Sequence, residues 1–168
     1  MDYEEKRLHA LTSLNLLDTP PSESFDRITR MAAQIFQLPI AAVSLTDIDR
    51  QWFKSKVGVD HGAIPRTKAP CAQVADNCKL VVIEDFERDE RYCDSLLGIS
   101  GIRFYAGAPL TTRDGYTLGA LCVLGTEPRK ITEAESSALQ DLASMVMSQI
   151  ELQHPPARLP IGLIFALS

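Results

Sequence analysis

Arg103 and Tyr105, two residues of one predicted strand, carry side chains suited to ligand binding. The run 102–110 is apolar and β-prone, and alternate side chains of a strand face opposite sides, so both residues share its less apolar face. A guanidinium binds carboxylates and phosphates through paired hydrogen bonds, and a phenol donates one. If this face borders a pocket, we expect both residues to contact a ligand. The alternative is that Arg103 pairs with an acidic residue, Asp85 or Asp94, and fixes a loop.

Two aromatic residues, Trp52 and Phe53, are further candidates to line a pocket. They are adjacent in the predicted strand 50–57, so they face opposite sides and only one of them can line any given face. The alternative is that one of the two lies in the core and the other covers the sheet edge.

The sequence predicts neither a metal site nor a catalytic centre. Its cysteines form no Cys-x-x-Cys pair, and its three histidines are far apart, so the spacing of a zinc site is missing. No Ser-His-Asp, paired-carboxylate or phosphate-loop pattern is present in the sequence. The four cysteines, which we expect to be free thiols, are Cys71, Cys78, Cys93 and Cys122.

The elements that must position these residues alternate between helical and strand patterns. Apolar residues recur at helical spacing in 2–17, 22–37 and 132–152, and Thr132 with Glu135 forms a capping box. Strands are predicted at 40–45, 50–57, 80–84, 102–110 and 116–124, and Asp114-Gly115 joins the last two as a hairpin. The segment 58–78 is predicted to be a long loop with one or two helical turns. This order indicates an α+β fold.

Composition narrows the class of protein. The chain has 168 residues, 45% of them hydrophobic, and a net charge of −5, which is typical of a globular domain and argues against a nucleic-acid partner. The N-terminus lacks the pattern of a secretory signal, and no apolar run approaches the length of a membrane span. We therefore expect a cytoplasmic protein with no membrane partner.

Two stretches together resemble a GAF domain. They are LNLLDTPPSESFDRITRMAAQIFQLPIAAVSLTDIDRQWFKSKVG and IRFYAGAPLTTRDGYTLGALCVLG, and the similarity covers residues 4–152. The chain most resembles the subgroup found as input modules of bacterial histidine kinases and diguanylate cyclases. The resemblance implies a central antiparallel sheet of five or six strands, with terminal helices on one face and a pocket on the other. The loops between residues 57 and 101 would cover that pocket.

The resemblance implies a sensory domain and leaves alternatives open. GAF domains bind small molecules or act as dimerising modules without a known ligand. Bilin-binding members use a cysteine, but Gln73, two residues after Cys71, replaces the histidine that the subgroup usually has there. We therefore expect Cys71 to pack beneath the covering loops. Free methionine-(R)-sulfoxide reductases are GAF-fold enzymes with reactive thiols. Cys93-Asp94-Ser95 is similar to their Cys-Asp-Ser segment, but Arg103 has the wrong charge for their substrate-binding acid.

We therefore predict a single GAF domain, residues 1–152, that senses an unidentified small molecule, has no enzymatic activity and is followed by a tail, residues 153–168. The sequence names no cofactor. Its ligand-binding candidates are Trp52, Phe53, Cys71, Asp85, Arg103 and Tyr105. We expect a homodimer through the terminal helices, with the leucine stripe at residues 8, 11, 14 and 17 contributing. Because the chain ends soon after its last predicted helix, we expect a signalling output protein that acts in trans, or an output domain that has been lost. A cavity beneath the covering loops is the main requirement of the sensing hypothesis.

Overall fold

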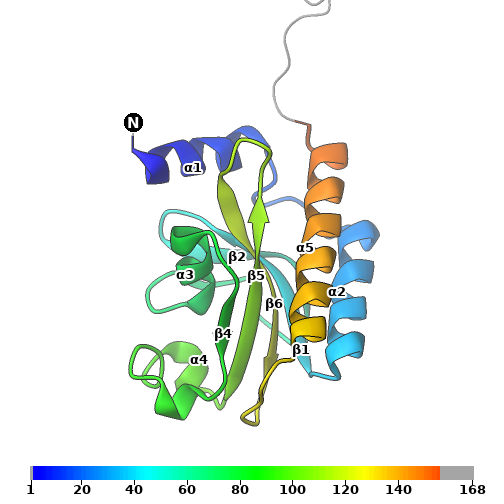
Figure 1. The fold of residues 1–168 in the computed structure, drawn as a ribbon. Coiled ribbons are helices and arrows are strands. Elements are labelled where there is room, and N and C mark those ends of the chain that lie inside the picture. The colour runs from blue at the N-terminus through cyan, green and yellow to red at the C-terminus, as the bar shows by residue number, and fades with distance from the viewer. Residues whose placement is uncertain (1, 156–168) are drawn as a thin grey trace, which may run out of the picture.

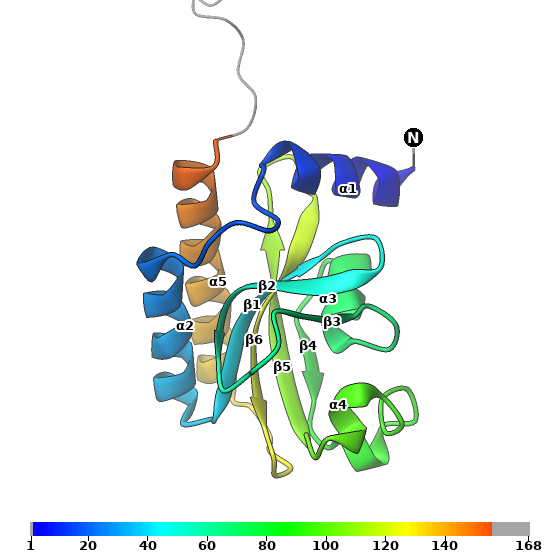
Figure 2. The ribbon, with the colours of Figure 1, turned by 180° about the vertical axis from the view of Figure 1, so that it is seen from behind.

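The predicted hairpin lies within a six-stranded antiparallel sheet, with helices on both faces (Figure 1, Figure 2). This computed structural model describes residues 2–155. The strand order is β3-β2-β1-β6-β5-β4, so the α+β prediction of five or six strands is confirmed. The strands are β1 (Ile40–Thr46), β2 (Arg50–Val57), β3 (Ala63–Pro65), β4 (Val81–Ile83), β5 (Phe104–Thr111) and β6 (Thr117–Gly125). The helices are α1 (Tyr3–Ser13), α2 (Glu23–Phe36), α3 (Pro70–Asn77), the 3₁₀ turn η1 (Phe86–Arg88), α4 (Leu96–Ile99) and α5 (Glu133–Gln153).

One face of the sheet is covered by α2 and α5, which lie side by side (Figure 1). Their apolar stripes pack on alternate residues of the central strands, including Val43, Phe104 and Leu121, which are fully buried. The predicted capping box starts α5, since Thr132 and Glu135 each accept a hydrogen bond from the other's backbone N–H.

The other face is covered by α3, η1, α4 and the loops that join them, residues 66–80 and 84–102, called the roof below (Figure 2). The prediction of helical turns near Cys71 is confirmed by α3. The sequence did not indicate β3, a three-residue edge strand within the predicted long loop. Because β3 is so short, it carries too little alternation to stand out in the sequence.

Helix α1 is shorter than predicted and lies across the end of the β5–β6 hairpin (Figure 1). The predicted helix 2–17 ends at Ser13, and Asn15 and Asp18 adopt positive φ angles of 52° and 62° that are incompatible with a continuing helix. Leu11 and Leu14 are buried in the core. The predicted leucine stripe is therefore not a free surface, and its role in pairing two chains has to be withdrawn.

A β-bulge in β2 changes the predicted alternation of that strand. Val43 is opposite Ser55 and Ser44 is opposite Phe53, so Lys54 is the extra residue. Ser55 consequently hydrogen-bonds Asp26 of α2, on the helix-covered face. The simple alternation predicted for 50–57 therefore holds only as far as Phe53.

No helix among residues 2–155 is both long and apolar enough to cross a membrane. The predicted tail falls outside the described residues from residue 156 onward.

Candidate functional site

A buried group of polar side chains lies on the sheet beneath the roof. Ser44 and Thr46 of β1 and Gln51 of β2 are fully buried there, although the sequence analysis assigned no role to any of them. Strand β1 alternates, with Ala41, Val43 and Leu45 toward the helices, so its two hydroxyl groups face the roof. The signal was present in the sequence IAAVSLT, but a strand with alanines on both faces gives little reason to prefer either face.

Gln51 is only partly satisfied. Its Oε1 accepts hydrogen bonds from Ser44 Oγ at 3.1 Å and from Thr46 Oγ1 at 2.8 Å. Its Nε2 is buried and has no hydrogen-bond partner among the described residues. A buried donor without a partner costs about 1–3 kcal/mol. The floor beneath the roof therefore holds a polar group that an added acceptor would stabilise.

Tyr105 and Cys71, two predicted site residues, meet in the same place. Tyr105 of β5 is fully buried, and its hydroxyl lies 2.9 Å from Cys71 Sγ on α3. The phenol fits because Gly107 lies beneath it: a Cβ at residue 107 would be 2.2 Å from the Tyr105 oxygen. Gly107 pairs with Cys122 of β6. The Cys71 thiol is thus held between roof and sheet, as the packing interpretation expected.

Hydrogen bonds and burial shift the pKa values of Cys71, Cys122 and Tyr105. Hydrogen bonds from Cys122, Tyr105 and Ser44 lower the pKa of the Cys71 thiol, although burial opposes them. The Cys71 hydrogen bond and burial raise the pKa of Cys122 well above its ordinary value. Burial likewise raises the pKa of Tyr105. The phenol is therefore a neutral hydrogen-bonding group at physiological pH.

Apolar side chains fill much of the space between roof and sheet. Val74 of α3, Phe86 of η1 and Tyr92 of the following loop are each at most 7% exposed and pack with Ile83 and Leu124. The Tyr92 hydroxyl donates a hydrogen bond to Gln73 Oε1 within the roof. A ligand beneath the roof would therefore meet these packed side chains in the space where a pocket was predicted.

Arg103 forms a two-point ion pair with Asp85 at the edge of the sheet, with contacts of 2.8 and 3.0 Å. Asp85 also caps η1 by accepting from Glu87 N, and the Arg103 hydrogen bonds lower the pKa of its carboxyl. This is the loop-fixing arrangement that the sequence analysis offered as the alternative to ligand binding. Both residues line an open groove of about 670 Å³ outside the packed space.

The bulged strand β2 separates Trp52 from Phe53. Phe53 packs against the roof-side core, whereas Trp52 packs against the helix-side core. Trp52 therefore does not line the space beneath the roof, which corrects its place among the candidates. The ligand-binding roles of the other five candidates remain predictions.

The described residues contain no group of three or more histidine, cysteine or acidic side chains that could hold a metal ion. Cys78 and Cys93 are exposed free thiols, and Cys71 and Cys122 are buried free thiols.

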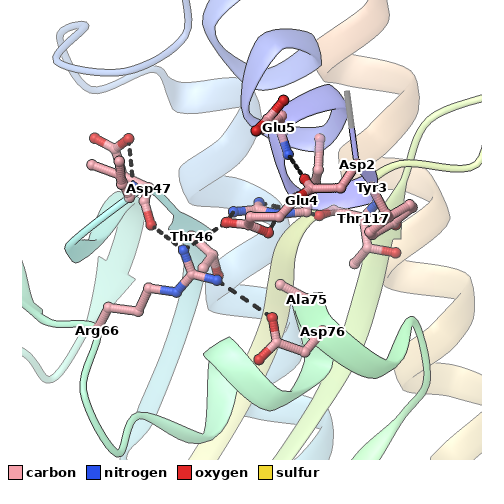
Figure 3. A network of polar contacts seen from close by, with 12 residues as sticks. Asp2, Tyr3, Glu4, Glu5, Thr46, Asp47, Arg66, Ala75, Asp76 and Thr117 are labelled. Atoms are coloured by element: carbon pink, nitrogen blue, oxygen red, sulfur yellow. Dashed lines mark hydrogen bonds and ion pairs between the residues drawn. The ribbon is translucent and has the colours of Figure 1, made fainter.

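An ion-pair network joins α1 to the roof (Figure 3). Glu4 of α1 accepts hydrogen bonds from the fully buried Arg7 and from Arg66 at the start of the roof. These hydrogen bonds lower the pKa of Glu4 from 4.5 to about 2. Arg66 also donates to the Asp47 carbonyl at 2.9 Å and to Asp76 of α3 at 3.4 Å. A shift of the roof would therefore change the contacts of α1.

The chain belongs to the GAF family, because residues 20–150 match the family model described as GAF domain. The cyclic di-GMP phosphodiesterase PA2567 of Pseudomonas aeruginosa is 37% identical over 150 residues, which are 88% of this chain. The chain spans about a quarter of that relative's length, 26%. Family membership and this signalling relative support a sensory, regulatory role.

Solved structures share the fold at low sequence identity. The GAF domain of an Acinetobacter phosphoenolpyruvate-protein phosphotransferase has a TM-score of 0.67 at 18% identity, covering 92% of this chain and 96% of that one. A free methionine-R-sulfoxide reductase from Neisseria meningitidis has a TM-score of 0.65 at 17% identity, covering 90% and 92%. At these identities the likeness concerns the fold alone.

Proposed function

We propose that this GAF domain is a non-catalytic sensor whose roof opens to admit a small polar ligand onto the floor formed by Ser44, Gln51 and Tyr105. The observation that carries the proposal is the buried, unpartnered Nε2 of Gln51. A ligand oxygen placed there would accept its hydrogen bond and remove the cost of leaving it unpaired. The closed, packed roof is then the ligand-free state.

Ligand binding would act by shifting the balance between closed and open roofs. A ligand that reaches the floor only in the open state binds the two states with different affinity, which is the condition for a switch. The change would reach α1 through Arg66, which contacts Glu4 on one side and Asp76 of α3 on the other. It would reach α5 through the central strands on which that helix packs.

The output of this switch would be a cyclic-di-GMP signalling activity, either in the same polypeptide or in a partner acting in trans. This part of the proposal is supported by the phosphodiesterase relative, in which the matching region is a quarter of the protein. The domain itself would act by binding and coupling.

Ligand binding can be tested by thermal unfolding against a panel of cyclic nucleotides, amino acids and carboxylic acids, together with native mass spectrometry of the freshly purified protein. A ligand at a hundred times its Kd should stabilise the fold by about 2.7 kcal/mol. Gln51→Leu should abolish that stabilisation, whereas Gln34→Leu, on the exposed face of α2, should preserve it. A ligand that stabilises Gln51→Leu equally would place the site elsewhere.

A ligand-free dimerisation module is the second candidate, favoured by apolar side chains that the helix layer exposes. Met31 and Ile35 of α2 are 38% and 51% exposed, and Met145 and Leu152 of α5 are 46% and 74% exposed. A second copy packed on α2 and α5 would bury them. Light scattering tests this: a strict monomer at high micromolar concentration removes the dimer. Ile35→Glu with Met145→Glu should dissociate a dimer formed through this face.

The reductase alternative is separable by chemistry. The reductase activity would be established if the protein reduced free methionine sulfoxide and Cys93→Ser abolished this turnover. We expect no turnover from the unaltered protein or from the variant.

A further inference from the structure

Cys71 and Cys122 come from different elements and lie against each other beneath the roof. The Tyr105 hydroxyl is over Gly107, as shown by the 2.2 Å that would separate it from a Cβ there. Gly107 is directly opposite Cys122 in the β5–β6 pairing, and the Tyr105 hydroxyl is 2.9 Å from Cys71 Sγ. The Cys71 sulfur therefore lies close to Gly107 and to its cross-strand partner Cys122 on β6. The side chain of Cys122 points into the same roof-side core.

The surroundings of the two sulfurs favour reaction at Cys71. Cys71 occupies the first turn of α3, directly after Pro70, where the free N–H groups of a helix stabilise negative charge. Hydrogen bonds from Cys122, Tyr105 and Ser44 lower the pKa of its thiol. Cys71 is also slightly accessible, 6% exposed, whereas Cys122 is 2% exposed. The helix start and the hydrogen bonds thus make Cys71 the more reactive thiol of the two.

We propose that Cys71 and Cys122 are a peroxide-sensitive thiol pair that closes to a disulfide between the roof helix α3 and the central strand β6. The Cys71 thiolate attacks one oxygen of hydrogen peroxide, the O–O bond breaks, and the products are the sulfenic acid of Cys71 and, after proton uptake, water. The Cys122 sulfur then attacks the sulfenic sulfur, and the hydroxyl group leaves as a second water with the proton from Cys122. The two thiols lose two electrons in all, and the peroxide gains them.

The disulfide would hold the roof on the sheet. Helix α3 contributes Val74 and Ala75 to the packing beneath the roof, so a covalent bond at residue 71 opposes any movement that withdraws them. Roof opening would then be controlled by oxidants as well as by a ligand. This response needs no ligand, so it stands even if the sensing proposal fails.

The test uses Cys78→Ser with Cys93→Ser, which removes the two exposed thiols and leaves the buried pair. After exposure to hydrogen peroxide, we expect the intact mass to fall by two hydrogen atoms and the thiols to resist alkylation in urea. Trypsin should release peptides 69–79 and 114–129 as one cross-linked species, which dithiothreitol separates. The oxidised protein should unfold at higher urea concentration and exchange its α3 amides more slowly.

Adding Cys122→Ser to this background is the matched control, and it should give no cross-linked peptide. The proposal is overturned if both thiols stay fully alkylatable at peroxide concentrations that oxidise Cys78 and Cys93 of the unaltered protein. Sulfenic or sulfinic acid at Cys71 without the cross-linked peptide overturns it equally.

Discussion

Replacing Gly107 with alanine tests the packing beneath the roof most directly. A Cβ at this position would lie 2.2 Å from the Tyr105 hydroxyl oxygen, 2.7 Å from Cζ and 2.9 Å from Cε1. A small rotation of the side chain cannot relieve contacts under 3.0 Å with the hydroxyl oxygen and two ring carbons, because Tyr105 is fully buried. The ring must leave its place and lose its hydrogen bond to Cys71.

The expected effect is a loss of about 1–3 kcal/mol in the free energy of unfolding, the usual cost of overpacking a core. Gly→Ala otherwise tends to stabilise by about 0.4–1 kcal/mol through the unfolded chain, so the sign itself is informative. Gly62→Ala is the matched control, since no atom lies within 4 Å of a Cβ there.

Urea denaturation followed by far-UV circular dichroism measures both variants. Tyr105→Leu completes a double-mutant cycle, because the alanine at 107 should cost much less once the ring is absent. If Gly107→Ala is as stable as Gly62→Ala, or if its cost is unchanged by Tyr105→Leu, the ring does not lie over Gly107. The placement of Cys71 over the hairpin would then fail with it.

Three further predictions concern the ion pairs and caps. The pKa of Glu4 is lowered in the folded state from 4.5 to about 2, so its stabilising contribution is complete above pH 4.5 and is lost as the pH falls through about 2. Glu4→Gln should therefore be less stable than the unaltered protein at pH 7, and the urea midpoints of the two proteins should converge near pH 2. A difference that stays constant with pH would contradict the ion pairs of Glu4 with Arg7 and Arg66. Thr132→Ala should lower the free energy of unfolding by about 0.5–2 kcal/mol, because it removes the α5 cap, as measured by urea denaturation. Arg103→Lys should lower the urea midpoint by breaking the two-point pair with Asp85, and less so at high ionic strength; an effect that grows with salt would count against the ion pair.

The packed space beneath the roof changes how sensing has to be understood in this domain. The sequence placed Arg103 and Tyr105 on one face of a strand, and this suggested a shared pocket. The structure separates their roles, since Tyr105 is buried against Cys71 and Arg103 fixes Asp85 at the sheet edge. A ligand site is thus proposed for the open roof, with Gln51 in place of Arg103 as its polar anchor.

The local helices, strands and turns could be predicted from the residue pattern alone. Asp114-Gly115 marked the hairpin, and the capping box at Thr132 marked the start of α5. Period-two alternation placed Tyr105 and Phe104 on opposite faces of the sheet. These features depend on residues a few positions apart, whose backbone geometry is the same in any protein.

The contacts between those elements could be found only from the folded chain. The bulge at Lys54 moved the residues of β2 that follow it to the other face of the sheet, and the positive φ of Asn15 ended the helical path of α1. Packing of the roof on the sheet brought Cys71 against Cys122. These contacts join residues that are distant in sequence, and they are chosen by which side chains fill a shared space without voids or clashes. Two cysteines about fifty positions apart become one chemical group only when Gly107 leaves room for the phenol that lies between roof and sheet.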